Sequence, residues 1–209
     1  MKGLDRKPPD SPTAVRRFDS AYYRRFYLTP ATRAMSRGET EQRGRLIAVA
    51  MQQLDLPVNR ILDVGCGLGW FRKPLLKAWP QARYVGVEFS DYLCQKHGWT
   101  HGSVVDYRSR VPFDLVICSD VLQYLDQVLA SRAIANLARL SRAALYLHVP
   151  TLADFRERMD PSGTDIEVKL RSGAWYRREL RKHFVHAGFG LYIKNDVPVA
   201  QWELEGGGT

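Results

Sequence analysis

The sequence predicts an α/β fold, in which helices cover both faces of a mostly parallel sheet. The main observation is the segment 61–69, an apolar run that contains an acid and ends in three glycines at every second position. Short apolar runs then alternate with longer segments of helical spacing, and the run at 115–117 lacks the polar alternation of a half-exposed strand. A strand covered on both faces has this pattern, so we expect an open sheet between two layers of helices.

The N-terminal part is predicted to contain a tail and two helical segments. Residues 1–18 are charged and rich in proline, so we expect a flexible tail before a single domain over 19–209. Aromatic residues recur near helical spacing until Pro30 interrupts them, which predicts a helix or lid over 19–38. A clear amphipathic helix is predicted over Glu39–Leu54, with an inner face of Leu46, Ile47, Val49, Ala50 and Leu54.

The glycines after the first strand predict a turn in which the backbone comes close to a ligand. Gly65, Gly67 and Gly69 lack a Cβ and can take positive φ. The dinucleotide fingerprint Gly-x-Gly-x-x-Gly is not met, because Trp70 stands where its third glycine belongs. Asp63 would repel a pyrophosphate and suits a ligand that carries a positive charge. The alternatives are a tight turn without a ligand and a dinucleotide site of altered spacing.

The Asp-x-Gly-x-Gly-x-Gly run at 63–69 resembles the first motif of the class I S-adenosylmethionine-dependent methyltransferases. In that family the glycine turn lies against the amino-acid part of the cofactor, and the acid helps to hold its ammonium group. The resemblance implies that S-adenosylmethionine is the cofactor. It also implies a three-layer α-β-α sandwich with a seven-stranded sheet whose last strand is antiparallel. The residues that would contact the cofactor here are Asp63, Gly65, Cys66, Gly67 and Gly69.

A second strand, predicted over Arg83–Glu88, also ends in an acid. Glu88 lies 19 residues after Gly69, close to the spacing at which an acid accepts hydrogen bonds from ribose hydroxyls. We therefore expect Glu88 and its neighbour Phe89 to contact the cofactor. The alternative is a surface acid at the end of a strand.

A third strand is predicted over Gly102–Tyr107, with Asp106 at its tip. By the family resemblance, Asp106 accepts a hydrogen bond from the exocyclic amine of adenine. Tyr107 either stacks on the adenine ring or packs against the core.

The segment Phe113–Leu125 predicts a fourth strand that runs into a helix, and it matches the fourth motif of the same family. Ser119 and Asp120 follow this strand, so we expect them near the cofactor. Gln123 and Tyr124 come next, and their roles stay open.

The C-terminal part predicts further elements of the same kind. The helix after the glycine turn should become regular near Pro74, since proline is tolerated in a first turn. The remaining predictions are a helix over Gln127–Leu140, a strand over Ala143–Val149, a helix over Trp175–Ala187 ended by Gly188, and a hairpin of Leu191–Ile193 with Val197–Leu204.

Acceptor-side residues are predicted from the rule that ligands of open α/β sheets lie outside the carboxyl ends of the strands. This rule places an insertion at 150–170 on the acceptor side. His148, at the end of the fifth strand, is the candidate general base, which is required only if the acceptor loses a proton. The alternative is a histidine that hydrogen bonds to the backbone.

Aromatic residues are further candidates around the acceptor. Tyr22 and Tyr23 are candidate catalytic residues that, with Tyr27, would form a lid over the cofactor and acceptor. Trp175 and Tyr176 are candidates for the wall of the acceptor pocket. Ordinary aromatic packing is the alternative for all five.

Composition and charge limit the classes of partner that the chain can bind. The chain of 209 residues has a net charge of +9, concentrated in residues 1–45 (11 Lys and Arg against 5 Asp and Glu) and 169–183 (6 against 1). Such clusters attract an anionic acceptor or nucleic acid, or they are solvated helix faces. Three cysteines without paired spacing and the lack of a long apolar run predict a soluble, cytoplasmic protein that binds no metal and no membrane.

The expected function is methyl transfer to an oxygen or nitrogen of a small molecule. No proline-containing Asn/Asp-Pro-Pro-Tyr motif follows the fourth strand, which disfavours methylation of base or amide nitrogens. The Val-Leu-Gln-Tyr-Leu stretch at 121–125 resembles small-molecule members of the family. The alternatives are an RNA or protein methyltransferase that uses the basic clusters, and a non-catalytic cofactor-binding protein.

Overall fold

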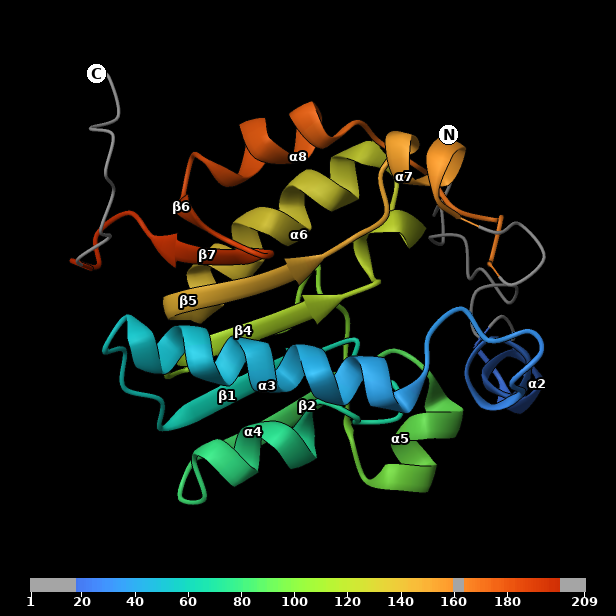
Figure 1. The fold of residues 1–209 in the computed structure, drawn as a ribbon, viewed down its shortest axis with the longest axis horizontal. Coiled ribbons are helices and arrows are strands. Elements are labelled where there is room, and N and C mark those ends of the chain that lie inside the picture. Colours follow the sequence, from blue (N-terminus) through green and yellow to red (C-terminus); the bar gives the residue numbers. More distant parts are fainter. Residues whose placement is uncertain (1–17, 160–163, 200–209) are drawn as a thin grey trace, which may run out of the picture.

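The computed structural model describes residues 18–159 and 164–199. They form a three-layer sandwich with a seven-stranded sheet in the middle (Figure 1). The strand order is β3-β2-β1-β4-β5-β7-β6, in which β7 is antiparallel to both neighbours and all other pairs are parallel. The predicted fold class is therefore confirmed.

Strands and helices follow one another along most of the chain. The strands are β1 (Arg60–Val64), β2 (Arg83–Glu88), β3 (Thr100–His101), β4 (Phe113–Ser119), β5 (Ser141–His148), β6 (Phe184–Gly188) and β7 (Leu191–Lys194). The helices are α2 (Ser20–Tyr23), α3 (Arg37–Gln53), α4 (Arg72–Ala78), α5 (Asp91–His97), α6 (Gln127–Leu140), α7 (Leu152–Glu157) and α8 (Gly173–Leu180). A π-helical turn, η1 (Arg24–Leu28), continues α2, and a 3₁₀ turn, η2 (Leu122–Tyr124), follows β4.

The two faces of the sheet carry separate hydrophobic cores. Leu62 and Val116 point to the face that α6 and α8 cover, whereas Ile61 and Leu115 point to the face that α3 and α4 cover (Figure 1). All four side chains are fully buried. Neighbouring residues of one strand thus enter opposite cores, which is why these strands lack polar alternation.

The predicted helix over Glu39–Leu54 is present as α3, but its inner face differs from the prediction. Ile47 is buried and Ala50 and Leu54 pack against the core as predicted, but Leu46 and Val49 are 42% and 62% exposed. The buried face also includes Thr40, Gly44, Ala48 and Met51. A Cβ on Gly44 would come within 2.6 Å of the Pro74 ring. Helix α3 therefore packs against α4 through its small residues, and this close approach sets its rotation.

The predicted third strand is wrong in position. Strand β3 comprises only Thr100–His101, and Gly102–Tyr107 is an irregular segment with a turn at 104–106. The amide of Gly102 still donates to the carbonyl of Glu88 (2.9 Å), but the amides of Asp106 and Tyr107 fold back onto the carbonyl of Ser103. This turn ends the pairing with β2 before Asp106 is reached.

The C-terminal prediction is also corrected. Helix α8 ends at Leu180, residues 181–183 form a turn, and the rest of the predicted helix lies in β6, which pairs with β7 in a hairpin. Phe189 and Gly190 form its turn with φ of 50° and 81°. Residues 197–199 are not a strand, and 200–204 lie outside the described residues, as does the predicted tail except for Phe18. The predicted helices and strands at 83–88, 127–140 and 143–149 are confirmed within two residues.

A buried carboxylate joins three elements of the sheet, and it generates a stability prediction. Asp114, 2% exposed, accepts hydrogen bonds from the amides of Asn59 (2.8 Å) and Arg60 (2.9 Å) and pairs with Arg142. Asp114→Ala should lower the free energy of unfolding by about 2–4 kcal/mol, because two buried amides lose their acceptor. Urea denaturation measures this. Arg142→Ala, which removes a half-exposed partner, should cost about 1 kcal/mol or less, and equal losses would contradict the prediction.

Candidate functional site

The glycine turn after β1 is held by backbone hydrogen bonds and leaves one glycine open. The amides of Gly65 and Cys66 donate to the carbonyl of Val87 (2.7 and 3.2 Å), and all three motif glycines have positive φ of 52–70°. A Cβ on Gly65 would come within 2.3 Å of Val121. A Cβ on Gly67 would meet nothing within 4 Å. Gly67 therefore presents bare main chain to a ligand, while Gly65 is required for packing.

Two aromatic residues that the sequence did not single out complete this turn. The indole nitrogen of Trp99 donates to the carbonyl of Gly67 (2.9 Å), and its ring would lie within 2.5 Å of a Cβ on Gly69. The Tyr84 hydroxyl donates a short hydrogen bond to Asp63. Their positions in β2 and before β3 carry no sequence signal, because the contacts depend on how the strands pair.

Asp63 is a buried carboxyl group beside the glycine turn. The residue is 1% exposed, and Tyr84 is its hydrogen-bond partner. Burial raises the pKa of Asp63 to about 7; the hydrogen bond from Tyr84 acts in the opposite direction, and the nearby charge of Glu88 adds to the rise. A positive group placed beside Asp63 would restore its ionised form.

Glu88 links the end of β2 to the glycine turn. It is 5% exposed and accepts hydrogen bonds from the amides of Gly67 (2.8 Å), Phe89 (2.8 Å) and Ser90 (2.9 Å). Two of these bonds go to Oε1 and one to Oε2. A carboxylate has about four acceptor positions, so Oε2 retains one for a ligand hydroxyl.

The structure separates the remaining cofactor candidates. Phe89 is 39% exposed and stacks on His101 with 5.9 Å between ring centres. Asp106 is exposed in the turn that follows β3, and Tyr107 packs partly buried against the core. Two cavities lie at the carboxyl ends of the strands, and neither Asp106 nor Tyr107 lines either of them. Their contacts with adenine stay a prediction.

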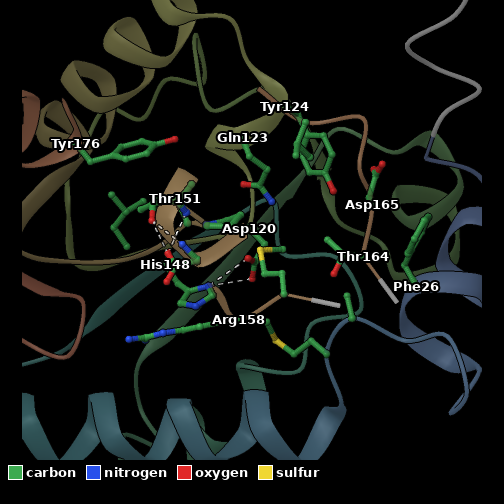
Figure 2. Close-up of a pocket in the computed structure, with 18 of the residues that line it drawn as sticks. Phe26, Asp120, Gln123, Tyr124, His148, Thr151, Arg158, Thr164, Asp165 and Tyr176 are labelled. Carbon is green, nitrogen blue, oxygen red and sulfur yellow. Dashed lines mark hydrogen bonds and ion pairs between the residues drawn. The ribbon is translucent and has the colours of Figure 1, made fainter. Parts of the chain in front are cut away.

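Two cavities meet at the carboxyl ends of the strands. A small one of about 50 Å³ lies over the glycine turn and is lined by residues that include Asp63, Gly65, Cys66, Gly67, Ser119 and Asp120. A large cleft of about 860 Å³ is drawn in Figure 2. Both are lined by Tyr27, Met35 and Asp120, so they adjoin at these three residues.

Asp120 and His148 form a hydrogen-bonded pair at this junction (Figure 2). The Nδ1 atom of His148 lies 3.1 Å from Oδ1 of Asp120, and the Ser119 hydroxyl donates to Oδ2 (2.9 Å). Burial acts to raise the pKa of Asp120, but the hydrogen bond and charge of His148, together with Ser119, bring it below its ordinary value. Asp120 has a φ of 57°, a conformation that costs free energy in a non-glycine residue and is common at functional sites.

The N-terminal aromatic segment covers the cleft, but its tyrosines have different environments. Tyr22 lines the cleft, and its hydroxyl lies 2.7 Å from that of Tyr124. Tyr27 lines both cavities and packs edge-on against Trp70. Tyr23 is buried away from the cleft, and burial raises the pKa of its hydroxyl. The geometry thus keeps Tyr22 as a candidate and gives no access to Tyr23.

Other lining residues come from segments far apart in the sequence. Gln123 and Tyr176 line the cleft, whereas Trp175 is buried outside it. Arg33, Arg43, Arg158 and Arg177 also line it, and sequence reasoning did not single them out. Arg33, Arg43 and Arg177 lie in the two basic segments, which was their sequence signal, whereas Arg158 lies within the predicted acceptor-side insertion at 150–170.

Metal and membrane features are absent from the part of the chain that the structure describes. Residues 18–159 and 164–199 contain no group of three His, Cys, Asp or Glu side chains arranged to hold a metal ion. No helix in these ranges has the length and apolar character needed to span a bilayer.

Comparison with known proteins gives a consistent result. A family profile described as "Methyltransferase domain" matches residues 62–143. The chain is 30% identical over 125 residues to a malonyl-[acyl-carrier protein] O-methyltransferase of Magnetococcus marinus, covering 52% of this chain and 46% of that protein. It is 33% identical over 84 residues to a trans-aconitate 2-methyltransferase of Rhodopseudomonas palustris, covering 37% and 32%. The matches thus span less than half the length of these curated relatives.

Solved structures share the fold at low identity. Streptomyces venezuelae DesVI superposes with a TM-score of 0.57 at 15% identity, over 75% of this chain and 91% of that one. The magnesium protoporphyrin IX methyltransferase of Synechocystis, solved with bound S-adenosylmethionine, has a TM-score of 0.52 at 20% identity, over 74% and 79%.

The raised pKa of Asp63 predicts a pH-dependent stability. Because the folded state holds the proton up to about pH 7 and the unfolded state only up to 3.8, stability falls as pH rises between these values. Asp63→Asn keeps an acceptor for Tyr84 and carries no charge. Between pH 4 and pH 8, the free energy of unfolding of the unsubstituted protein should therefore fall relative to that of Asp63→Asn by on the order of 4 kcal/mol.

Chemical denaturation at several pH values checks this prediction. Asp91→Asn removes a carboxylate from an exposed position on α5 and serves as the control. If Asp63→Asn and Asp91→Asn shift stability in parallel across pH, the burial argument for Asp63 is contradicted.

Proposed function

Since this chain contains a class I S-adenosylmethionine-dependent methyltransferase domain, we propose that it transfers a methyl group to an oxygen or nitrogen of a small-molecule acceptor. The observation that carries the proposal is the meeting of two cavities at Asp120, one over the glycine turn and one open to an acceptor. A fold alone does not define a reaction, so the residues at this junction must support it.

The residues of the glycine turn fit the cofactor. Gly67 offers open main chain, Asp63 offers a carboxyl group to an ammonium, and Oε2 of Glu88 has room for a ribose hydroxyl. The bound cofactor supplies a methyl group on a positively charged sulfur. The chain's own task is then to hold the acceptor in line with that methyl group and to keep water out.

The Asp120–His148 pair is placed to act on the acceptor. In the neutral imidazole, donation of the Nδ1 proton to Asp120 makes Nε2 the acceptor atom of His148. No described residue is a hydrogen-bond partner of Nε2, and His148 lines the cleft. We infer that Nε2 takes the proton of an acceptor hydroxyl or amine, with Asp120 orienting the ring and stabilising the imidazolium.

The small-molecule acceptor is favoured by the dimensions of the cleft and by the curated relatives. Its volume of about 860 Å³ lies in the range of small-ligand sites. One relative is named for trans-aconitate, a small molecule, and supports this choice, whereas another is named for a malonyl group on a carrier protein, which is a protein-bound acceptor. The basic segments keep RNA or protein acceptors as alternatives.

Calorimetry with S-adenosylhomocysteine tests cofactor binding. An ammonium beside Asp63 favours the ionised carboxyl, so binding should release a proton below pH 7. As pH rises toward 7, the dissociation constant should therefore fall by up to about tenfold per pH unit. Asp63→Asn should weaken binding by about tenfold or more and remove this pH dependence. Asp91→Asn is again the control. Failure of the unsubstituted protein to bind would refute the proposed cofactor site.

Acceptor class is tested by radiolabelled methyl transfer from S-adenosylmethionine into a cell extract that is then separated by size. We expect label among small molecules. Label confined to RNA or protein would favour the macromolecular alternative. Cofactor binding with no label in any fraction would favour a non-catalytic protein.

The role of His148 is tested once an accepting fraction is available. His148→Asn should lower kcat by about 10² or more and remove the rise of the rate with pH, because proton removal is lost. His186→Asn is a matched control, since His186 also lines the cleft but packs at a tilt of 42° against the ring of Tyr192, whereas Asp120 hydrogen bonds to His148. An unchanged pH profile in His148→Asn, with cofactor affinity intact, would exclude the base.

A further inference from the structure

The cleft has an unbalanced set of charged groups. Four arginines line it (Arg33, Arg43, Arg158 and Arg177), and none of them forms an ion pair with a carboxylate of the described residues. Elsewhere in the same ranges, Arg37, Arg142 and Arg178 do pair with acids. The guanidinium groups of the cleft are thus available to a ligand.

The acids of the cleft are already engaged by other donors. Asp120 accepts from His148 and Ser119. Asp154 caps α7 and accepts from the amide and hydroxyl of Thr151 (3.0 and 2.7 Å). Asp165 accepts from the amide of Glu167 (3.0 Å). Each acid of the cleft thus already accepts a hydrogen bond from a protein donor, whereas the four guanidinium groups pair with no described carboxylate, and this difference favours an anionic ligand.

Two of the arginines lie close to the proposed reaction centre. Arg43 projects from α3, and its guanidinium lies 3.7 Å from Sδ of Met35, which lines both cavities as Asp120 does. Arg158 follows α7, where its amide donates to the carbonyl of Asp154 (2.9 Å), and both residues line the cleft together with His148. Figure 2 shows Arg158 below His148, on the side opposite Gln123 and Tyr124. Arg43 and Arg158 therefore belong to the neighbourhood of the Asp120–His148 pair.

We propose that Arg43 and Arg158 bind an oxyanion of the acceptor, a carboxylate or a phosphate, and so select anionic small molecules. This inference rests on the proposed methyltransferase function. A guanidinium donates two parallel hydrogen bonds to either oxyanion, which fixes its orientation as well as its charge. The anion then holds the reacting oxygen or nitrogen of the same molecule at the junction marked by Asp120 and His148.

The opposite wall of the cleft provides a second contact for such a molecule. Gln123 is 4% exposed, lines the cleft, and its side chain hydrogen bonds to none of the described residues. A buried amide oxygen without a hydrogen-bond donor costs free energy unless a ligand donates a hydrogen bond to it. Arg158 and Gln123 thus provide polar contacts on two sides of the reaction centre.

The test uses a small-molecule extract that is split by strong anion exchange before reaction with radiolabelled S-adenosylmethionine. The acceptor should be in the retained, anionic fraction. Treatment of that fraction with alkaline phosphatase distinguishes the two oxyanions: a phosphate ester loses its acceptor activity, and a carboxylate keeps it. An acceptor found only in the unretained fraction would overturn the proposal and leave the methyltransferase function standing.

Arginine variants test the assignment to these two residues. With the retained fraction, R43Q and R158Q should each raise KM roughly tenfold with little change in kcat, since a bound anion contributes equally before and during methyl transfer. The KM of the unsubstituted protein should rise with salt, and this rise should be weaker in both variants.

Matched controls come from the same elements. R45Q on α3 and R156Q on α7 remove exposed arginines that do not line the cleft, so they should leave KM unchanged. Calorimetry with S-adenosylhomocysteine verifies that each variant is folded and binds cofactor. A KM that is the same in R43Q, R158Q and the controls would refute the anion site. If the unsubstituted protein does not bind S-adenosylhomocysteine, the proposed function itself is refuted.

Discussion

The parallel register of three central strands is the constraint on which the site depends. Strand β4 pairs with β1 on one side and with β5 on the other, so Val64 lies beside Cys118 and Ser119 lies beside His148. The carboxyl ends of all three strands therefore reach the same edge of the sheet, where ligands of open α/β folds bind. The amide of Asp120 donates to the carbonyl of His148 (2.9 Å) and extends this pairing beyond the last strand residue. A shift in register would separate the pair.

The carboxylates at this edge differ because their surroundings differ. Glu88 is satisfied by three backbone amides, which also connect it to Gly67. Asp63 has a tyrosine hydroxyl and little water, so its pKa rises to about 7. Asp120 has a histidine and a serine, and its pKa falls. Asp63 can thus bind a cationic group, whereas Asp120 is ionised and hydrogen bonds to the imidazole of His148.

A buried arginine connects two segments that form one wall of the cleft. Arg171 is 7% exposed and donates to the carbonyls of Leu122 and Leu125 and to the hydroxyl of Tyr176. These bonds connect the turn after β4 to the segment before α8. Because Gln123 lies within that turn, its place on the cleft depends on a residue 48 positions away.

The sequence by itself determined the α/β class, the glycine turn and the acids at the ends of the first two strands, because apolar patterning, glycine spacing and strand-end position are local properties of the chain. It did not predict that Asp120 holds His148, that α3 turns Leu46 outward, or that Arg43 and Arg158 face the same cleft. These relations join residues far apart in sequence, and they follow from strand register and from the close packing of α3 on α4. The short third strand was missed for the same reason, since the backbone turns at Ser103 replace its pairing. Local pattern identifies each element, whereas only tertiary packing decides which side chains meet.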